Sequence, residues 1–374
     1  MKKLLVVAKS LGGGGSEVAL IEFLNHLDES KFDVTLLLLD KDMEYRYRLK
    51  KKIKIKYIKF DNKFYYLFAS MYALPGKIIK KIKLNKYFPI YDYLAMHCKM
   101  PCLPNYDIAI DFYGYGSFTT AFVALNVKAN KKAFWLHDEK MPWIINVDKY
   151  FDVYDKIFGV SQAIKRTFTN IYPQYKEKAD VFYNVIDIEN IRKKATEFYP
   201  TEFKKNTFNI VTVGRLTEQK GYDVSIKAAK KLCDKEIKFK WFAIGDGKDR
   251  YKLEKLIKKL NLSNNFILLG RRDNPYPYIK NCDIYIQFSR HEGYGLSVLE
   301  ARALDKPIIV SNLPVFKEQI TDKKNGIVAH FDENSLFRSI EELYQNDKLK
   351  NEIKANVLRE KINFDGQMSK LDCI

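Results

Sequence analysis

Residues Ser289–Gln319 read SRHEGYGLSVLEARALDKPIIVSNLPVFKEQ. Two acidic residues, Glu292 and Glu300, stand eight positions apart here, around a glycine-rich turn. The apolar spacing predicts a helix that begins at Leu296 and a buried strand over Pro307–Val310. Backbone N–H groups of a turn at a helix N-terminus attract a phosphate or a polar hydroxyl group. Two carboxylates beside such a turn suit a ligand that carries both hydroxyl groups and phosphate, as a sugar nucleotide does.

A second motif lies upstream, where residues 211–223 read VTVGRLTEQKGYD. An apolar strand is followed by Gly214, Arg215 and Lys220, and a helix is expected to begin near Tyr222. Gly214 permits a tight exit from the strand. Arg215 offers a planar, permanently charged fork that matches diphosphate oxygens, and Lys220 adds a mobile positive charge.

The two motifs, in this order and about 75 residues apart, resemble those of retaining GT-B glycosyltransferases of the Glu-x7-Glu type, the family 4-like "glycosyl transferases group 1". The resemblance implies transfer of a sugar from a nucleotide diphosphate sugar with retention at the anomeric carbon. It assigns the donor sugar to Glu292, the ribose to Glu300, and the diphosphate charge to Arg215 and Lys220. It further implies donor binding by Gly214, Gly293, Tyr294, Gly295, Leu296, Ser297 and Glu300.

Alternating apolar runs and helical patterns predict an α/β protein with parallel sheets. The resemblance implies the GT-B plan, two Rossmann-like doubly wound domains that face a central cleft. We expect an acceptor-side domain over residues 1–200, with a polar linker at Tyr199–Thr207, and a nucleotide-sugar-binding domain over 201–350. Residues 351–374 are expected to return toward the first domain. Predicted strands are Lys3–Ala8, Val34–Leu39, Ile53–Lys59, Asp107–Phe112, Ala133–Leu136, Lys156–Val160, Ala179–Tyr183, Phe208–Val213, Lys238–Gly245, Phe266–Leu269, Asp283–Phe288, Pro307–Val310 and Gly326–Val328.

The loop LGGGGSEVAL, residues 11–20, invites a dinucleotide-binding interpretation. It fails the G-x-G-x-x-G test, because Glu17 and Val18 stand where the third glycine would fall, which argues against a dehydrogenase. Gly14 and Gly15 instead resemble the family's Gly-Gly-x-Glu loop near the donor diphosphate. A helix beginning at Ser16 or Glu17 would add its dipole. A plain flexible turn is the alternative.

Two further residues on the first-domain side are candidates. His137 ends an expected strand in FWLHDE and matches the active-site His of similar glycosyltransferases, which lies near the donor sugar. Asn184, in a turn after the strand Ala179–Tyr183, is expected to meet the diphosphate. A packed or surface role is the alternative for His137, and His291 beside Glu292 could serve as well.

The net charge of +19 is unevenly placed. The segment Tyr45–Tyr87 holds fourteen Lys or Arg residues, and Asp61 is the one acidic residue in it. The aromatic and aliphatic stretch Phe64–Leu74 is interleaved with this charge. Such a pattern suits an anionic membrane surface. A solvated basic face is the alternative, and nucleic acid is not expected, because no recognised nucleic-acid motif accompanies the charge.

The chain has 374 residues and five scattered cysteines. The odd number and the scatter of the cysteines are consistent with a reducing cytoplasm. We therefore expect a cytoplasmic protein held peripherally at the inner face of the plasma membrane. Its partners would be a nucleotide-sugar donor, with UDP the commonest nucleotide, and a lipid-linked glycan acceptor of capsule, exopolysaccharide or lipopolysaccharide assembly. Positive side chains can balance a diphosphate, so no metal or other cofactor is expected. A zinc site at His97, Cys98 and Cys102 would lack a second ligand pair.

Other functional classes share parts of this pattern. A GT-B-shaped epimerase or phosphorylase would not pair Gly-Arg-x4-Lys with Glu-x7-Glu so closely. A non-catalytic basic adaptor at the membrane would require a vestigial donor site, whereas every donor-site residue that the resemblance implies is present.

Overall fold

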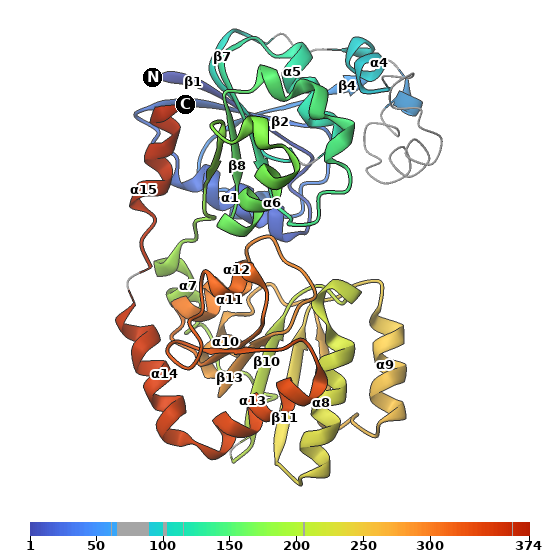
Figure 1. Cartoon of the computed structure of the whole chain (residues 1–374), viewed down its shortest axis with the longest axis vertical. Coiled ribbons are helices and arrows are strands. Elements are labelled where there is room, and N and C mark those ends of the chain that lie inside the picture. The colour runs from blue at the N-terminus through green and yellow to red at the C-terminus, as the bar shows by residue number, and fades with distance from the viewer. Residues whose placement is uncertain (61, 66–89, 100–102, 115, 205, 361) are drawn as a thin grey trace. The chain divides into compact units, whose positions relative to one another are not determined.

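The computed structural model describes residues 1–60, 62–65, 90–99, 103–114, 116–204, 206–360 and 362–374. These residues form two compact units, Met1–Ile186 with Phe364–Ile374 and Asp187–Asn363. Each unit holds a parallel sheet flanked by helices (Figure 1), which confirms the prediction of two Rossmann-like domains. Most of the predicted membrane-facing segment, 66–87, lies outside the described residues.

The sheet of the first unit has seven parallel strands in the order β3-β2-β1-β6-β7-β8-β9. Their bounds are Lys2–Ala8 for β1, Phe32–Leu38 for β2, Lys54–Tyr57 for β3, Tyr106–Asp111 for β6, Ala129–Leu136 for β7, Lys156–Gly159 for β8 and Ala179–Val181 for β9. The helices of this unit include α1 (Gly15–His26), α4 (Ile90–Met96), α5 (Phe118–Asn126) and α6 (Gln162–Ile171). Apolar side chains fill β1 because a parallel strand is covered on both faces.

One predicted strand of this unit, Ile53–Lys59, is interrupted. The structure has β3 in the main sheet and β4 (Lys59–Phe60) in a separate antiparallel pair with β5 (Cys98–Lys99). Between them Ile58 is buried and its N–H donates to the carbonyl oxygen of Leu38. Burial of this apolar residue made the sequence pattern look like one continuous strand.

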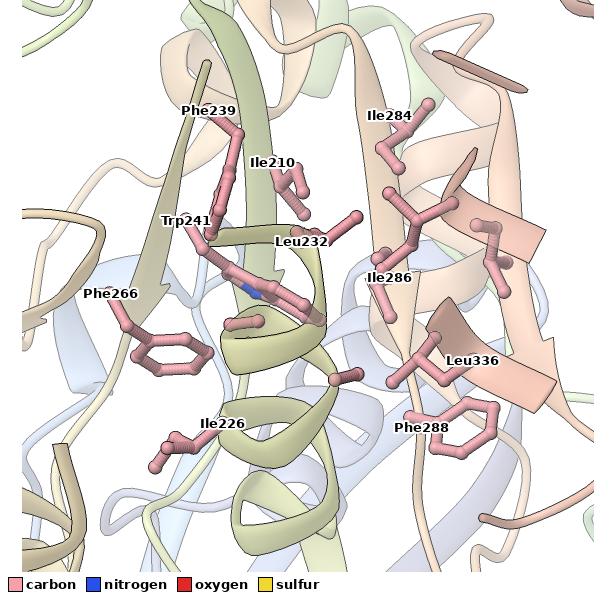
Figure 2. Packing of buried hydrophobic residues seen from close by; sticks show 14 of the residues in the cluster. Ile210, Ile226, Leu232, Phe239, Trp241, Phe266, Ile284, Ile286, Phe288 and Leu336 are labelled. Carbon is pink, nitrogen blue, oxygen red and sulfur yellow. The ribbon is translucent and has the colours of Figure 1, made fainter. Parts of the chain in front are cut away.

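The sheet of the second unit has six parallel strands in the order β12-β11-β10-β13-β14-β15. Their bounds are Phe208–Val213 for β10, Phe239–Ile244 for β11, Phe266–Gly270 for β12, Ile284–Gln287 for β13, Ile308–Ser311 for β14 and Ile327–Ala329 for β15. The helices are α7 (Ile188–Lys194), α8 (Tyr222–Asp234), α9 (Arg250–Lys259), α10 (Tyr276–Asn281), α11 (Leu296–Ala303), α12 (Pro314–Lys317), α13 (Glu333–Gln345) and α14 (Asp347–Arg359). On one face, Trp241 and Ile286 pack with Ile226 of α8 and Leu336 of α13 in one apolar core (Figure 2).

The boundary between the units differs from the predicted one at residue 200. Helix α7 belongs to the second unit. Arg192 Nε donates to the carbonyl oxygen of Ala303 at 3.0 Å, and Asn274 Nδ2 donates to that of Lys194 at 2.8 Å. These bonds bind the residues before the expected linker to the second sheet's helices, so composition alone misplaced the boundary.

The last residues, 364–374, form α15 (Asp365–Met368) and η7 (Ser369–Cys373) and belong to the first unit. Gln367 Oε1 accepts a hydrogen bond of 2.9 Å from the N–H of Tyr183, and Lys31 pairs with Asp372 at 3.2 Å. Residues 351–363 stay with the second unit. Across the described parts of the chain, no helix combines the length and the apolar character that crossing a membrane requires.

Both sheets reverse their strand order beside the first strand of the unit. Strand β1 lies between β2 and β6, and β10 lies between β11 and β13. In open parallel sheets, ligands bind outside the carboxyl ends of the strands at such a point of reversal. The loops after β10 and β13 are therefore where a functional site of the second unit is expected.

Candidate functional site

The two sequence motifs follow the two strands at the reversal point of the second sheet. Gly214 comes directly after β10, and Ser289 stands two positions after the end of β13. Strands β10 and β13 are hydrogen-bonded neighbours in which Val211 lies opposite Tyr285. Motifs that are far apart in the chain thus meet at one edge of one sheet.

Lys220 and Glu292 form the central contact of this site. Lys220 Nζ lies 2.5 Å from Glu292 Oε1, with 14% and 8% of the two side chains exposed. Glu292 Oε1 also accepts a hydrogen bond of 2.7 Å from Ser289 Oγ. Gly221 directs the chain here with φ +66°, and a Cβ on it would lie 2.1 Å from the carbonyl oxygen of Phe288. Only glycine fits this position, which brings Lys220 against the second motif.

Gly214 and Arg215 serve this loop in different ways. Gly214 does not use a left-handed backbone conformation. A Cβ on it would lie 3.4 Å from the stem of Lys220, which is an ordinary van der Waals contact, and its carbonyl oxygen accepts a hydrogen bond of 2.9 Å from Tyr222 OH. The Arg215 side chain is exposed and makes no hydrogen bond or ion pair with another described residue. Its guanidinium is therefore available to an anionic ligand.

The glycine-rich turn begins α11 as predicted. Gly295 has φ +84°, and a Cβ on it would lie 2.6 Å from Phe316, so glycine is required. Gly293 and Tyr294 are buried, and the carbonyl oxygen of Tyr294 accepts a hydrogen bond of 2.6 Å from Gln319 Nε2. This hydrogen bond holds the turn in place.

The first turn of α11 provides unpaired donors. No described residue accepts a hydrogen bond from the backbone N–H groups of Leu296 and Ser297, as is usual for a first helical turn. These N–H groups and the helix dipole favour negative charge at this end. The Ser297 hydroxyl points to the sheet instead, because it donates to Gln287 Oε1 at 3.0 Å.

Glu300 lies one turn along α11, as expected. Its Oε1 accepts a hydrogen bond of 3.1 Å from the hydroxyl of Tyr276 on α10. The sequence interpretation missed this contact, since nothing in NPYPYIK distinguishes Tyr276 from a core tyrosine. His291, the other histidine considered, is partly exposed, and its carbonyl oxygen accepts a hydrogen bond of 3.0 Å from Gln219 Nε2.

In the first unit, His137 directly follows β7 at the carboxyl edge of the sheet. Its Nε2 lies 2.7 Å from the carbonyl oxygen of Phe112. A carbonyl can only accept, so Nε2 carries the proton and Nδ1 keeps its lone pair. Burial lowers the pKa of His137 to about 4, so the imidazole is neutral near pH 7.

The Gly14-Gly15 loop leads from β1 into α1, which begins at Gly15, one residue earlier than expected. A Cβ on Gly14 would lie 2.3 Å from the carboxylate of Glu17, whereas a Cβ on Gly15 would meet nothing within 4 Å. Gly15 therefore faces open space at the start of a helix. Asn184, 9% exposed, follows β9 at the same carboxyl edge.

The sequence interpretation also missed Asp111, an acid of the first unit at the carboxyl end of β6. It is fully buried and accepts hydrogen bonds from Thr120 Oγ1 at 2.6 Å and the N–H of Tyr113 at 3.1 Å. Burial raises the pKa of Asp111 to about 6. Its only sequence signal is an acid that ends the apolar run YDIAID.

The described residues contain no group of three His, Cys, Asp or Glu side chains that could hold a metal ion. Of the zinc candidates, Cys98 is buried and its Sγ donates to the carbonyl oxygen of Ala95 at 3.0 Å. Cys102 lies outside the described residues.

Comparison with known proteins adds to this geometry. The family model "Glycosyl transferases group 1" matches residues 193–359, within the second unit. Over 170 residues, the uncharacterized glycosyltransferase MJ1059 of Methanocaldococcus jannaschii is 34% identical, which covers 44% of this chain and 42% of that protein. The N-acetylgalactosamine-N,N'-diacetylbacillosaminyl-diphospho-undecaprenol 4-alpha-N-acetylgalactosaminyltransferase of Campylobacter jejuni is 26% identical over 380 residues, 98% of this chain and 96% of that protein.

Among solved structures, Anabaena Alr3699/HepE in complex with UDP and glucose superposes with a TM-score of 0.75. The match covers 100% of this chain and 98% of that one at 16% sequence identity. The chain therefore has the predicted GT-B fold. Both sequence relatives carry names of glycosyltransferases.

Proposed function

We propose that this chain, a GT-B protein, is a retaining glycosyltransferase that moves a sugar from a nucleotide diphosphate sugar, a UDP-sugar, to a hydroxyl group. The observation that carries this proposal is the Lys220–Glu292 contact of 2.5 Å at the edge of the second sheet. A cation, a carboxylate and the unpaired N–H groups of α11 meet there. These groups suit a diphosphate next to a sugar hydroxyl.

The chemistry proposed is front-face substitution. The bond between the anomeric carbon and the diphosphate oxygen breaks, the acceptor oxygen bonds to the same face of that carbon, and the leaving diphosphate takes the acceptor proton. Arg215, Lys220 and the N–H groups of α11 stabilise the negative charge that grows on the diphosphate. These positive groups serve in place of a metal ion. Glu292 holds the donor sugar and Glu300 holds the ribose.

The donor site is tested by calorimetric titration of the protein with UDP, GDP and ADP in the presence of EDTA. We expect one nucleoside diphosphate to bind, and Glu300→Ala to weaken that binding at least tenfold by removing the ribose contact. Glu352→Ala, which removes an exposed carboxylate from α14, is the matched control and should bind normally. A folded wild-type protein that binds none of the three would overturn the proposal and favour a non-catalytic membrane adaptor.

The role of Arg215 is tested by turnover. Removal of one preorganised charge at a diphosphate lowers turnover by about 100-fold or more, and we expect this of Arg215→Ala. The variant should remain fully folded because the side chain is exposed. Arg338→Ala removes an exposed arginine from α13 and serves as control. A near-normal rate in Arg215→Ala would remove this residue from the site.

The proposed acceptor is a lipid-linked glycan of bacterial surface polysaccharide synthesis. The Campylobacter relative is named for a diphospho-undecaprenol acceptor and for forming an alpha linkage. In this chain, the basic segment Tyr45–Tyr87 would hold the first unit at the inner face of the plasma membrane. Its described part exposes two aromatic side chains, Tyr47 by 64% and Phe64 by 66%.

Membrane binding is tested by flotation with vesicles of phosphatidylcholine, with and without phosphatidylglycerol. We expect flotation with the anionic vesicles and its loss when Lys50, Lys52 and Lys59 are changed to Glu. The control changes an equal number of exposed lysines on α9, Lys252, Lys258 and Lys259, to Glu. Equal loss in both variants would show that net charge, and not this segment, is responsible.

A further inference from the structure

Strand β13 has one apolar and one polar face. Ile284 and Ile286 point into the core beside α8, as Figure 2 shows. The residues between and after them, Tyr285, Gln287 and Ser289, are fully buried but polar. Because successive side chains of a strand point to opposite faces, these three are directed toward the face that α11 covers.

The polar face forms one continuous chain of hydrogen bonds that ends at Glu292. Gln287 Oε1 accepts from Tyr285 OH at 2.9 Å and from Ser297 Oγ at 3.0 Å. Gln287 Nε2 donates to Ser289 Oγ at 3.0 Å, and Ser289 Oγ donates to Glu292 Oε1 at 2.7 Å.

The direction of this chain follows from the chemistry of its members. The carboxylate of Glu292 can only accept, so the single hydroxyl hydrogen of Ser289 must point toward it. The hydroxyl oxygen of Ser289 then needs a donor, which is the amide NH₂ of Gln287. The amide oxygen of Gln287 consequently faces the two hydroxyls of Tyr285 and Ser297. Each bond therefore determines the orientation of the next.

The consequence for Glu292 is that one carboxylate oxygen is fully engaged. Oε1 accepts from both Lys220 and Ser289. Oε2 accepts no hydrogen bond from any residue that the structure describes. The chain of bonds holds the carboxylate by one oxygen and leaves the other to accept from a ligand hydroxyl.

We propose that Gln287 and Ser289 are positioning residues that hold the carboxylate of Glu292 in the orientation for binding the transferred sugar. This inference rests on the proposed function and adds to it a set of residues that contact no substrate themselves. A carboxylate displaced by a fraction of an ångström loses much of its effect on the reaction, since catalysis depends steeply on geometry.

The test is a double-mutant cycle between Ser289→Ala and Glu292→Gln. The wild type is first assayed with UDP-glucose, UDP-galactose, UDP-N-acetylglucosamine and UDP-N-acetylgalactosamine. The donor that it turns over is then used for every variant. We expect Ser289→Ala to lower turnover about tenfold or more while the dissociation constant of UDP changes less than about twofold. In the Glu292→Gln background, Ser289→Ala should have little further effect, because the two residues act as one unit.

The matched control is Ser339→Ala, which removes a buried hydroxyl that donates to the carbonyl oxygen of Ser335 at 2.9 Å, on α13. It should leave turnover unchanged. Ser289→Thr restores a hydroxyl at the same position and should recover part of the rate. If Ser289→Ala does not fold, Tyr285→Phe is used instead, because it removes the hydroxyl at the start of the chain of hydrogen bonds. We expect the same non-additivity with Glu292→Gln.

Three outcomes would overturn the inference. Normal turnover in a folded Ser289→Ala does so directly. Equal losses from Ser289→Ala in the wild-type and Glu292→Gln backgrounds would assign Ser289 a general structural role. A wild-type protein that binds UDP-sugars and UDP to no measurable extent would remove the proposed function itself, and the inference with it.

Discussion

The ammonium group of Lys220 lies 2.5 Å from Oε1 of Glu292, although the two residues are 72 positions apart in the chain. Both side chains are largely buried, so each charged group has lost much of its hydration and interacts with the opposite charge instead. The contact exists because the loops after β10 and β13 share one edge of the sheet. It places a cation and a carboxylate where a ligand can contact both.

Removing one partner of this ion pair should destabilise the protein. We expect Lys220→Ala to lower the free energy of unfolding by on the order of 3 kcal/mol, because it leaves Glu292 charged and buried without its cation. Urea unfolding measures this. Lys323→Ala breaks an exposed pair with Glu342 and should cost less than about 1 kcal/mol. Similar losses in both variants would mean that Glu292 is well solvated.

A substitution of Gly15 can distinguish a role in ligand binding from a role in folding. A Cβ on this residue meets no atom within 4 Å, and α1 begins here. Gly15→Ala should therefore keep its stability or gain up to about 1 kcal/mol. If a donor phosphate approaches the loop closely, turnover should nevertheless fall. Gly366→Ala, also made in open space, is the control. Full turnover in Gly15→Ala would support a plain flexible turn.

Tyr276 should contribute to nucleotide affinity through Glu300. Tyr276→Phe removes the hydroxyl that donates to Glu300 Oε1 and keeps the shape of the ring. We expect nucleoside diphosphate affinity to weaken by about 3- to 10-fold, the value of one hydrogen bond. The control is Tyr278→Phe on the same helix, which removes a hydroxyl that donates to Glu202 at 2.9 Å. Equal nucleotide affinities of the two variants, measured by calorimetry, would show that the Tyr276 hydroxyl does not contribute to nucleotide binding.

His137 should make stability depend on pH in the acidic range. Its folded pKa of about 4 lies below the ordinary 6.5, so the unfolded chain binds the proton first. The neutral ring stabilises the fold fully above pH 6.5, and this contribution is lost as pH falls toward 4. The loss amounts to about 3 kcal/mol and should be absent in His137→Gln. Imidazole NMR signals of His137 that titrate near pH 6.5 would contradict this.

Asp111 should act in the opposite sense. Burial raises its pKa to about 6 from 3.8, so the folded protein retains the proton longer than the unfolded chain. Its contribution to stability is fully present below pH 3.8 and is lost as pH rises through about 6. Relative to Asp111→Asn, the wild type should lose about 3 kcal/mol between pH 3.8 and 6. A difference between the two proteins that is constant across this range would refute the assignment.

Local pattern was sufficient to predict most of the secondary structure. Apolar runs indicated nearly all strands of both sheets, and the turn before Leu296 marked the start of α11. The same motifs indicated which residues would gather at the second sheet, because parallel strands bring their carboxyl ends to one edge. The boundary at residue 187 was not predictable from composition, since side-chain contacts of α7 decide it.

The orientation of each candidate residue depends on tertiary contacts. Nothing in the local sequence shows that Tyr276 reaches Glu300, that the Phe112 carbonyl sets the tautomer of His137, or that Ser297 donates to Gln287. The alternation of YIQFS does mark a polar face on β13, but its partners come from other elements. Residue types and spacing thus determine which chemical groups are present at the site. The hydrogen bonds that orient them form between segments distant in the chain, and only folding brings those segments together.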